Sequence, residues 1–520
     1  METNQTSRPK PLVLISMDGV GVAGPGPGNA VTSANTPNLD KFWPEYPHTY
    51  LEAAGINVGL PQGVDGNSEV GHMTMGAGKI IFQDLPRIDN SISNGSFFAN
   101  PELKSAFAHA KKHKSNVHVI GLVSSGKVHA SLDHLNAVIK MASQEGCDPD
   151  CFFVHAITDG RDSSPKTSKE YLEKITAECS RFRMGRIASV VGRYFAMDRD
   201  QRWERIEVAY RMLTEGKGNI VTDISKMIDT SYAQGKTDEF MEPALIVLHA
   251  NDQPVMIHNN DAVIFTNFRP DRAIELTRAF VEDDFIGFER DKLENLFFVG
   301  LAEYDKGLPE HVAFPPEEME NYLGKVLSDN KLKQLRVAES EKFPHVTYFF
   351  NAGHQTILPG EVHLEVPSPK DISTFDQKPE MSQRWVTDIL LQKLDTQEFD
   401  FALINFAGPD MVAHTGVIEA TIKSMEVVDE CMGRIIEKVL SMNGAVILTA
   451  DHGNAEEMLN LQTGEPDTKH SVNPVPVIII QKDLKPRELL VGNLSDIAPT
   501  ILALLGLEKP AEMTGRNLLA

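Results

Sequence analysis

The chain has 520 residues, of which 41% are hydrophobic and 24% charged, with a formal net charge of −23 at pH 7. That length predicts two domains, because single cores rarely grow beyond about 250 to 300 residues. The negative charge argues against nonspecific binding to nucleic acid or to anionic membranes, and no apolar stretch approaches the roughly 20 residues of a membrane helix. The 4 cysteines are sparse and irregularly spaced, as in proteins of a reducing compartment. We therefore expect a cytoplasmic protein with no nucleic-acid or membrane partner.

Short apolar runs rich in β-forming residues alternate with longer helical patterns, which is typical of an α/β protein with a mainly parallel sheet. Buried strands are predicted at residues 11–17, 401–406 and 444–450. An acidic residue follows each of them: Asp18, Asp410 and Asp451. Because ligands of open α/β sheets bind beyond the carboxyl ends of the strands, we expect these three carboxylates to share one site.

The middle of the chain repeats this pattern with different chemistry. Further strands are predicted at residues 117–123, 152–157, 187–191, 262–267 and 296–301. The segments after them carry the following mostly basic side chains: His129, Arg161, Asp162, Arg193, Arg199, Arg269 and Arg272. Asp18 and Ser68 precede this second α/β sheet, while the other candidate metal ligands follow it. The simplest arrangement is a first α/β domain of residues 1–84 and 316–520, interrupted by an inserted domain of residues 85–315.

Ser68 lies in the segment Gly-Asn-Ser-Glu-Val-Gly-His at residues 66–72. Taken alone, a serine beside glycine usually satisfies backbone amides in a turn. A serine hydroxyl becomes a good nucleophile only when a base or a metal activates it. No Ser-His-Asp order is evident in the chain, so metal coordination is the favoured activator. A serine beside two metals predicts phosphoryl transfer through a phosphoserine.

Six side chains form a candidate ligand set for two divalent metals: Asp18, Asp410, His414, Asp451, His452 and His470. Asp410 and His414 are four residues apart, so on a helical turn they face the same side. Asp451 and His452 are adjacent and, on a loop, can address two ions. Mixed Asp and His ligation suits manganese, zinc, cobalt or magnesium without choosing among them. For each pair alone, an N-cap aspartate with a surface histidine is an equally good interpretation, but six such residues near three strand ends favour metals.

The arginines of the middle segment, together with Lys342, form a basic set. Arginine forks match the oxygens of carboxylates and phosphates bidentately, so the set predicts a small, multiply charged anion as ligand. Asp162, next to Arg161, is a candidate general acid and base. The alternative is a set of surface ion pairs, which stays open above all for Arg199 between two aspartates. His129 alone is equally well a ligand contact or a core or surface histidine.

At these residues the sequence resembles the cofactor-independent (2,3-bisphosphoglycerate-independent) phosphoglycerate mutases of the alkaline phosphatase superfamily. The resemblance runs from about residue 11 to the C-terminus. It is carried by the serine segment and by motifs at residues 159–162, 192–200, 267–272, 341–347 and 449–454. It implies an alkaline-phosphatase-like metal-binding domain, interrupted by an inserted substrate-binding α/β domain. It also implies an isomerase of glycolysis and gluconeogenesis that interconverts 3-phosphoglycerate and 2-phosphoglycerate without requiring 2,3-bisphosphoglycerate.

The resemblance further implies a role for each candidate residue. One divalent metal, most commonly manganese, would be held by Asp410, His414 and His470. The other would be held by Asp18, Ser68, Asp451 and His452, and Ser68 would be transiently phosphorylated. Glycerate binding would fall to His129, Arg161, Asp162, Arg193 and Arg199. Contacts to the phosphate and the substrate would come from Arg269, Arg272 and Lys342.

The implied catalytic residues are Ser68 as nucleophile, Lys342 as a charge partner of the phosphoryl group, and Asp162 as proton carrier between the two glycerate oxygens. The nearest alternative is another metal-dependent phosphotransferase of the superfamily, either a phosphatase or a phosphopentomutase. Serine rather than threonine as nucleophile, together with the long arginine-bearing insert, favours the glycerate mutase. A non-catalytic metal or phospho-ligand sensor would be expected to lose its nucleophile or a ligand, and this chain keeps both. A compact two-domain enzyme needs no partner chain, so we expect a monomer that acts on a small molecule.

Overall fold

The structure is a computed structural model that describes residues 8–308 and 310–520. The chain divides into two compact units. The first unit comprises the chain up to Gln83 together with Glu318–Ala520, and the inserted unit comprises Asp84–Glu317. The chain therefore passes from one unit to the other twice. No helix of the described residues has the length and apolarity that a membrane crossing requires.

The first unit is built on an eight-stranded sheet with the strand order β12-β11-β13-β1-β14-β15-β2-β16. The strands are β1 (Leu12–Met17), β2 (His48–Glu52), β11 (Gln334–Glu339), β12 (Glu361–Val366), β13 (Phe401–Phe406), β14 (Ala445–Thr449), β15 (Val475–Gln481) and β16 (Gly492–Asn493). The five strands from β12 to β14 are parallel to one another, and β15 runs antiparallel to both β14 and β2. The three strands predicted to deliver acidic residues, β1, β13 and β14, are adjacent at the centre of this sheet.

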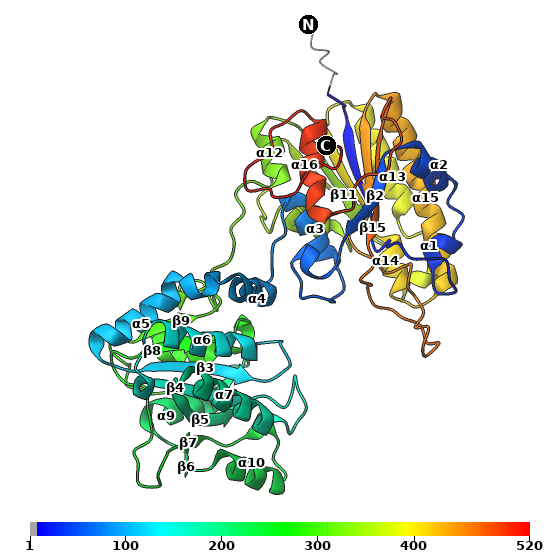
Figure 1. Ribbon diagram of the computed structural model, residues 1–520. Coiled ribbons are helices and arrows are strands. Elements are labelled where there is room, and N and C mark those ends of the chain that lie inside the picture. Colours follow the sequence, from blue (N-terminus) through cyan, green and yellow to red (C-terminus); the bar gives the residue numbers. More distant parts are fainter. Residues whose placement is uncertain (1–7, 309) are drawn as a thin grey trace. The chain divides into compact units, whose positions relative to one another are not determined.

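These central strands are continuous apolar runs because both faces of the sheet are covered. Every residue of β1, β13 and β14 is buried, as expected for parallel strands between two layers of helices. The helices of this unit are α1 (Ala30–Ser33), α2 (Pro37–Glu45), α3 (Ser68–Ala77), α12 (Leu323–Asp329), α13 (Gln383–Asp395), α14 (Gly408–Ala413), α15 (Ile418–Ser441) and α16 (Ile497–Leu504). Figure 1 shows α2, α13 and α15 on one side of the sheet and α3, α12 and α16 on the other.

The inserted unit has its own eight-stranded sheet, with the order β10-β9-β8-β3-β4-β5-β7-β6. Its strands are β3 (Val117–Val123), β4 (Phe152–Thr158), β5 (Arg186–Gly192), β6 (Asn219–Val221), β7 (Ala244–Ile246), β8 (Ala262–Phe265), β9 (Phe297–Gly300) and β10 (His311–Val312). The pairing of β5 with β7 is antiparallel, and the other pairs are parallel. The five strands predicted for this region are β3, β4, β5, β8 and β9, with ends shifted by at most two residues.

Helices of the inserted unit connect these strands in the usual crossover manner. They are α4 (Asp84–Asn94), α5 (Pro101–His113), α6 (Leu132–Gln144), α7 (Ser168–Phe182), α8 (Arg193–Ala196), α9 (Trp203–Glu215), α10 (Ile224–Ala233) and α11 (Ile274–Val281). The apolar faces of α5, α6, α7, α9 and α11 join the sheet in one hydrophobic core. A separate core fills the first unit, so each unit buries its own apolar surface.

Candidate active site

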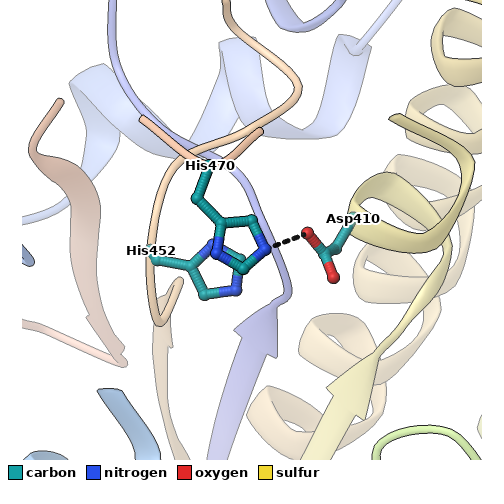
Figure 2. A group of neighbouring side chains, drawn as sticks. All are labelled: Asp410, His452 and His470. Atoms are coloured by element: carbon teal, nitrogen blue, oxygen red, sulfur yellow. Dashed lines mark ion pairs between the residues drawn. The ribbon is translucent and has the colours of Figure 1, made fainter. Parts of the chain in front are cut away.

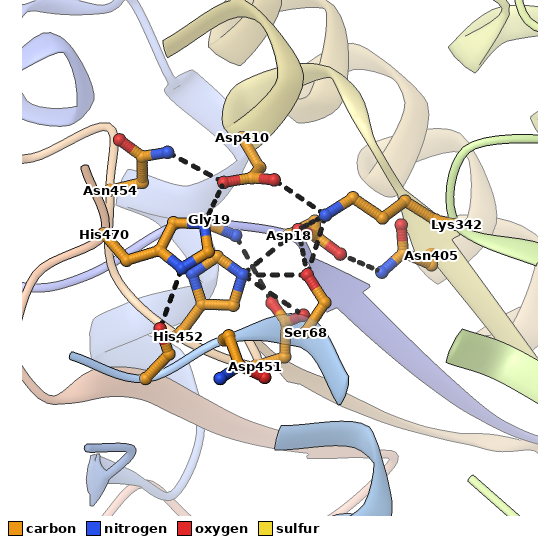
Figure 3. A network of polar contacts seen from close by, with 12 residues as sticks. Asp18, Gly19, Ser68, Lys342, Asn405, Asp410, Asp451, His452, Asn454 and His470 are labelled. Atoms are coloured by element: carbon orange, nitrogen blue, oxygen red, sulfur yellow. Dashed lines mark hydrogen bonds and ion pairs between the residues drawn. The ribbon is translucent and has the colours of Figure 1, made fainter. Parts of the chain in front are cut away.

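Three strand ends of the first unit bring its acidic residues together. In the parallel pairings of β1, Met17 lies opposite Phe406 of β13, and Ser16 lies opposite Thr449 of β14. The segments after the three strands therefore start at the same edge of the sheet. Figure 3 shows Asp18, Asp410 and Asp451 pointing into one polar cluster at this edge. All three side chains are buried, at 0%, 1% and 0% exposure.

Ser68 enters the same cluster from the start of helix α3. Asn67 caps this helix by accepting a hydrogen bond from Val70 N at 3.1 Å, so Ser68 is its first residue. Ser68 Oγ donates to Asp18 Oδ1 at 3.2 Å and lies 2.9 Å from His452 Nε2. The glycines of the serine segment permit this approach, since a Cβ on Gly71 would overlap the backbone of Asp451.

Lys342 also reaches the cluster, from the turn between β11 and a π-helical turn at His345–Phe349. Lys342 Nζ is 2.7 Å from Ser68 Oγ, 2.6 Å from Asp18 Oδ1 and 2.7 Å from Asp410 Oδ2. Burial opposes its positive charge, but the negative charges of Asp18, Asp410 and Asp451 raise the pKa of Lys342 above its ordinary value. By its charge this lysine was grouped with the arginines, although its place in the chain lies within the predicted first domain; in the structure it lies in the first unit, directly beside the candidate nucleophile.

The three predicted histidine ligands are oriented by backbone carbonyls. Nδ1 of His414 lies 2.8 Å from Thr468 O, Nδ1 of His470 lies 2.8 Å from Gly66 O, and Nδ1 of His452 lies 3.2 Å from its neighbour's carbonyl at Gly453. A proton on Nδ1 satisfies these carbonyls and leaves the Nε2 lone pair free for a metal, which is the usual outer contact of a metal-binding histidine.

The Nε2 atoms of these histidines converge on the carboxylates. His414 Nε2 is 3.1 Å from His470 Nε2, and these two nitrogens lie 3.3 and 3.4 Å from Asp410 Oδ1. Asp410 and His414 share a side across α14, as their spacing predicts. Ligand atoms of Asp410, His452 and His470, shown in Figure 2, lie within 4.8 Å of one another.

A second group with the same compactness consists of Asp18, Asp451 and His452, so His452 belongs to both groups. Among the described residues, the buried carboxylates of Asp18, Asp410 and Asp451 outnumber the one buried ammonium that faces them, that of Lys342. Bound cations would balance the remaining negative charge. Although burial opposes it, Asp451, Asp18 and Asp410 raise the pKa of His452 to about 10. The cluster thus attracts positive charge strongly, and its mixed nitrogen and carboxylate donors fit divalent transition metals.

A second polar cluster forms at the strand ends of the inserted unit. Arg193, which follows β5, donates to Asp159 Oδ1 at 2.6 Å and to Asp162 Oδ2 at 2.5 Å. His129 is 4% exposed; its Nε2 lies 3.6 Å from Asp162 Oδ2 and its Nδ1 lies 3.4 Å from Asp271 Oδ1. Burial and the charge of Arg193 lower the pKa of His129 to about 4. This histidine is therefore a neutral group among charged neighbours.

The other predicted arginines of this cluster are more exposed and are ion-paired. Arg199 and Arg269 both contact Asp271, at 3.2 and 3.1 Å, and Arg161 lies 3.4 Å from Glu239. The side chains of these three arginines are 49%, 50% and 54% exposed, so their guanidinium groups are accessible to a ligand.

Arg272 completes the basic cluster, and its pKa shows the effect of the positive charges around it. It donates to Met197 O at 2.9 Å. Burial and then the charges of Arg193, Arg199 and Arg161 lower its pKa. Such crowding of positive charge favours an anionic ligand. The structure thus brings the predicted site residues together as two clusters, one in each unit.

Comparisons with known proteins identify the family. The profile described as the BPG-independent PGAM N-terminus matches residues 88–306, and the profile described as sulfatase matches residues 291–507. The 2,3-bisphosphoglycerate-independent phosphoglycerate mutase of Clostridium beijerinckii is 48% identical over 511 residues, and that of Clostridioides difficile is 49% identical over 514 residues. Both alignments cover 98% of this chain and 99% of the relative. The chain belongs to the 2,3-bisphosphoglycerate-independent phosphoglycerate mutase family.

A solved structure agrees with this assignment. A Leishmania mexicana phosphoglycerate mutase, studied at low cobalt concentration, is 32% identical, with a TM-score of 0.53 and coverage of 99% of this chain and 98% of that chain. The predicted fold class, an alkaline-phosphatase-like α/β domain interrupted by a second α/β domain, is confirmed.

Family membership also decides among the activities left open by the sequence. The enzyme is a mutase that interconverts 3-phosphoglycerate and 2-phosphoglycerate, rather than a phosphatase or a phosphopentomutase. It depends on divalent metal and has no need of 2,3-bisphosphoglycerate.

Several residues that contact the mutase's predicted site residues received no role from the sequence. Asn405 donates to Asp18 Oδ2 at 2.7 Å, and its position inside an otherwise apolar strand was the available signal. His72 Nδ1 lies 3.2 Å from Asp451 Oδ2, one helical turn after the nucleophile. Asp271 pairs with two arginines and could have been found from its own Arg-Pro-Asp-Arg motif. Glu456, which contacts the loops that carry these residues, had no such signal, because a second glutamate follows it in a polar loop.

Proposed function

We propose that this mutase transfers the phosphoryl group to Ser68 and back, while the inserted unit holds glycerate. The observation that carries the proposal is the environment of one hydroxyl. The residue Ser68 is 5% exposed, and its Oγ lies within 3.2 Å of Lys342 Nζ, His452 Nε2 and Asp18 Oδ1. No turn role of serine requires such partners, whereas a nucleophile of phosphoryl transfer does.

The residues that would hold the metals are divided as the family resemblance implies. Asp410, His414 and His470 would hold one ion, and the other would be held by Asp18, Ser68, Asp451 and His452. When bound, two divalent cations supply positive charge for the transferred phosphoryl group and make a serine hydroxyl a better nucleophile at neutral pH. We propose manganese as the metal in the cell.

Lys342 supplies the protein's own charge to the transfer. Its Nζ is 2.7 Å from Ser68 Oγ, so it lies within reach of an oxygen of a phosphoryl group bonded to that atom. Ser68 Oγ, as the alkoxide that bound metals would favour, attacks phosphorus, and the glycerate oxygen leaves on the opposite side. Charge that develops on the equatorial phosphoryl oxygens is stabilised by the ammonium, with no reorganisation because Asp18 and Asp410 already fix its position.

The inserted unit would keep glycerate for the return transfer. The accessible guanidinium groups of Arg161, Arg199 and Arg269 can bind its carboxylate and the phosphate, and Arg272 adds charge behind them. Asp162, as a carboxylate, would take the proton of the other glycerate hydroxyl and pass it to the leaving oxygen. Arg193 and His129 hold this carboxylate in place, at 2.5 and 3.6 Å. Retained glycerate attacks the phosphoserine faster than a free acceptor would, because its effective concentration is high.

A trapping experiment tests the phosphoserine. Enzyme loaded with Mn²⁺ is mixed with 3-phosphoglycerate, quenched in acid and digested, and the peptide that contains Ser68 is analysed by mass spectrometry. We expect a phosphorylated fraction in wild type and none in Ser68→Ala, which should have no mutase activity but should keep a folded structure and weakened metal binding. Mutase turnover in Ser68→Ala would show that another group accepts the phosphoryl.

Oligomeric state and location complete the proposal. We propose a monomer that works in the cytoplasm on free phosphoglycerates, because each unit has its own core and both polar clusters are formed by residues of one chain. Light scattering of the purified enzyme tests the first statement, and fractionation of source cells tests the second. Metal analysis of enzyme purified without added metal tests manganese.

A further inference from the structure

Glu456 is a buried carboxylate in the loop after β14, and it accepts four hydrogen bonds. Its Oε2 accepts from Gly21 N and Asn454 N, each at 2.9 Å. Its Oε1 accepts from Asn473 Nδ2 at 3.0 Å and from Ser471 Oγ. The residue is 3% exposed, so these donors take the place of water.

The four donors come from three separate segments, and each segment carries candidate metal ligands. Gly21 lies three residues after Asp18, Asn454 lies two residues after His452, and Ser471 directly follows His470. These segments are loops without a strand or helix of their own, and single backbone hydrogen bonds join them: Ala455 N donates to Gly19 O at 2.9 Å, and Val22 N donates to Pro474 O at 2.8 Å. The Glu456 carboxylate adds one side-chain acceptor that is shared by all three ligand-bearing loops.

Asn454 extends this connection to a fourth segment. Its backbone donates to Glu456, while its side-chain Nδ2 donates to Asp410 Oδ1 at 2.8 Å, a contact drawn in Figure 3. The loops are also joined directly, since Ser471 N donates to Gly453 O at 2.9 Å. One buried side chain thus connects, directly or through one residue, to segments that carry both candidate metal groups.

Two glycines leave the space that this carboxylate occupies. A Cβ on Gly21 or on Gly453 would lie within 3.0 Å of the Glu456 carboxylate, closer than real Cβ atoms come. Neither glycine has a positive φ angle, so backbone conformation does not demand glycine at these positions. Close packing against Glu456 is the reason that the structure offers for Gly21, and close packing against Ser471 Oγ and Glu456 is the reason for Gly453.

We infer that Glu456 is a positioning residue of the metal site: it binds no metal itself and sets the affinity for metal by holding the loops of Asp18, Asp451, His452 and His470 together. Among the described residues, neither compact ligand group contains Glu456. Both of its oxygens are already engaged by donors. The inference rests on the proposed metal role of those four residues.

The test is the substitution Glu456→Gln in the full-length enzyme, with Glu457→Gln as matched control. The glutamine has the same shape, but its amide group presents hydrogens to two of the four donors. Glu457 is the next residue in the sequence and is exposed. Among the described residues, its carboxylate accepts one side-chain hydrogen bond, from Asn473 Nδ2 at 2.8 Å. Both variants and wild type are stripped of metal, and Mn²⁺ binding is measured by calorimetry or by detection of free Mn²⁺.

We expect the Mn²⁺ dissociation constant to rise roughly 10- to 100-fold in Glu456→Gln and to stay at the wild-type value in Glu457→Gln. At saturating Mn²⁺, the KM for 3-phosphoglycerate should be unchanged, because the residues proposed to bind glycerate belong to the inserted unit. A general loss of stability would instead lower the melting temperature of the metal-free protein without changing the dissociation constant of the folded fraction. That result would overturn the inference.

Ser471→Ala keeps the test decisive if Glu456→Gln does not fold. It removes one of the four hydrogen bonds, and we expect a smaller rise in the Mn²⁺ dissociation constant in the same direction. Wild-type affinity in Ser471→Ala, with Glu456→Gln unfolded, would assign Glu456 to folding alone. Failure of wild type to bind Mn²⁺ would be a different result, since it would contradict the proposed metal site rather than the role of Glu456.

Discussion

Replacing Lys342 with methionine tests the charge balance of the first unit most directly. Lys342 Nζ lies within 2.7 Å of Asp18 Oδ1, Asp410 Oδ2 and Ser68 Oγ, and its side chain is 6% exposed. Methionine is of similar length but carries no charge. Removing one partner of a buried ion pair costs about 3–5 kcal/mol, because the remaining charge stays buried without compensation. The free energy of unfolding of the metal-free enzyme should fall by about that amount.

The same substitution separates the lysine from the metals. An ammonium and a metal ion are attracted by the same carboxylates and repel each other, so Lys342→Met should bind Mn²⁺ at least as tightly as wild type. The turnover number should nevertheless fall roughly 100- to 1000-fold at saturating Mn²⁺, as when one charge-stabilising donor of a transition state is removed. Loss of a metal ligand would have the opposite signature, with weak binding of Mn²⁺.

Three measurements check this prediction: urea unfolding of the metal-free protein, Mn²⁺ titration, and kcat at saturating Mn²⁺. Lys325→Met is the control, since Lys325 forms an exposed ion pair with Asp329 on α12 and such pairs contribute at most about 1 kcal/mol. If Lys342→Met reached wild-type kcat once Mn²⁺ was saturating, the lysine would act only by organising the carboxylates. Its place beside the transferred phosphoryl group would then be wrong.

Two further predictions concern the inserted unit. Arg161→Ala should raise the ratio of phosphoglycerate hydrolysis to mutase turnover, because glycerate is held less well while the phosphoserine waits; a coupled assay with phosphate detection measures both, and an unchanged ratio with normal substrate binding would contradict it. Burial lowers the pKa of His118 and holds the pKa of His155 well below its ordinary value. Below a pH of about 6.5 the unfolded chain therefore binds protons that the folded chain does not. The free energy of unfolding should decrease, as the pH is lowered, by up to about 1.4 kcal/mol per histidine per pH unit. Urea midpoints at pH 7.5, 6.5 and 5.5 check this slope; His155→Gln should reduce it, and an equal slope in the variant would place the acid sensitivity elsewhere.

The positions of the strand-end acids could be predicted from the sequence because two independent patterns agree there. Runs such as Phe401–Phe406 are typical of buried strands, and ligand residues in parallel sheets follow the carboxyl ends. The i, i+4 spacing of Asp410 and His414 then places both side chains on one side of α14. These inferences use local spacing together with one rule of sheet geometry, and both are readable in a single chain.

Strands β11 and β12, at one end of the first sheet, could not be predicted because long-range contacts outweigh their local pattern. Strand β11 contains Gln334 and Arg336, both 0% exposed, and its neighbour β12 begins with Glu361. Arg336 Nε lies 3.4 Å from Glu361 Oε1, and its guanidinium stacks on the rings of Phe350 and Phe401. Charged residues in a sequence indicate an exposed face unless the distant partner that neutralises them is known.

The same limit applies to the candidate site. Glu456 is followed by another glutamate, and only the folded chain shows that one is buried among four donors while the other is exposed. Lys342 was likewise grouped with the arginines of the middle segment, because charge was the property that the sequence showed. Its position beside Ser68 depends on β11 lying next to β13, a strand order that the sequence does not contain.

Opposite fields in the two units explain how a chain with a net charge of −23 can bind an acidic metabolite. In the first unit, Asp451 and its neighbouring carboxylates overcome burial and raise the pKa of His452 to about 10. In the inserted unit, burial and then the charges of Arg193, Arg199 and Arg161 lower the pKa of Arg272. The first field attracts cations and the second attracts anions, so a phosphoglycerate together with divalent metals would neutralise both. Charges separated by more than the Debye length of about 8 Å are largely screened, so the net charge weighs less than the groups within a few ångströms, which decide which ligand stays.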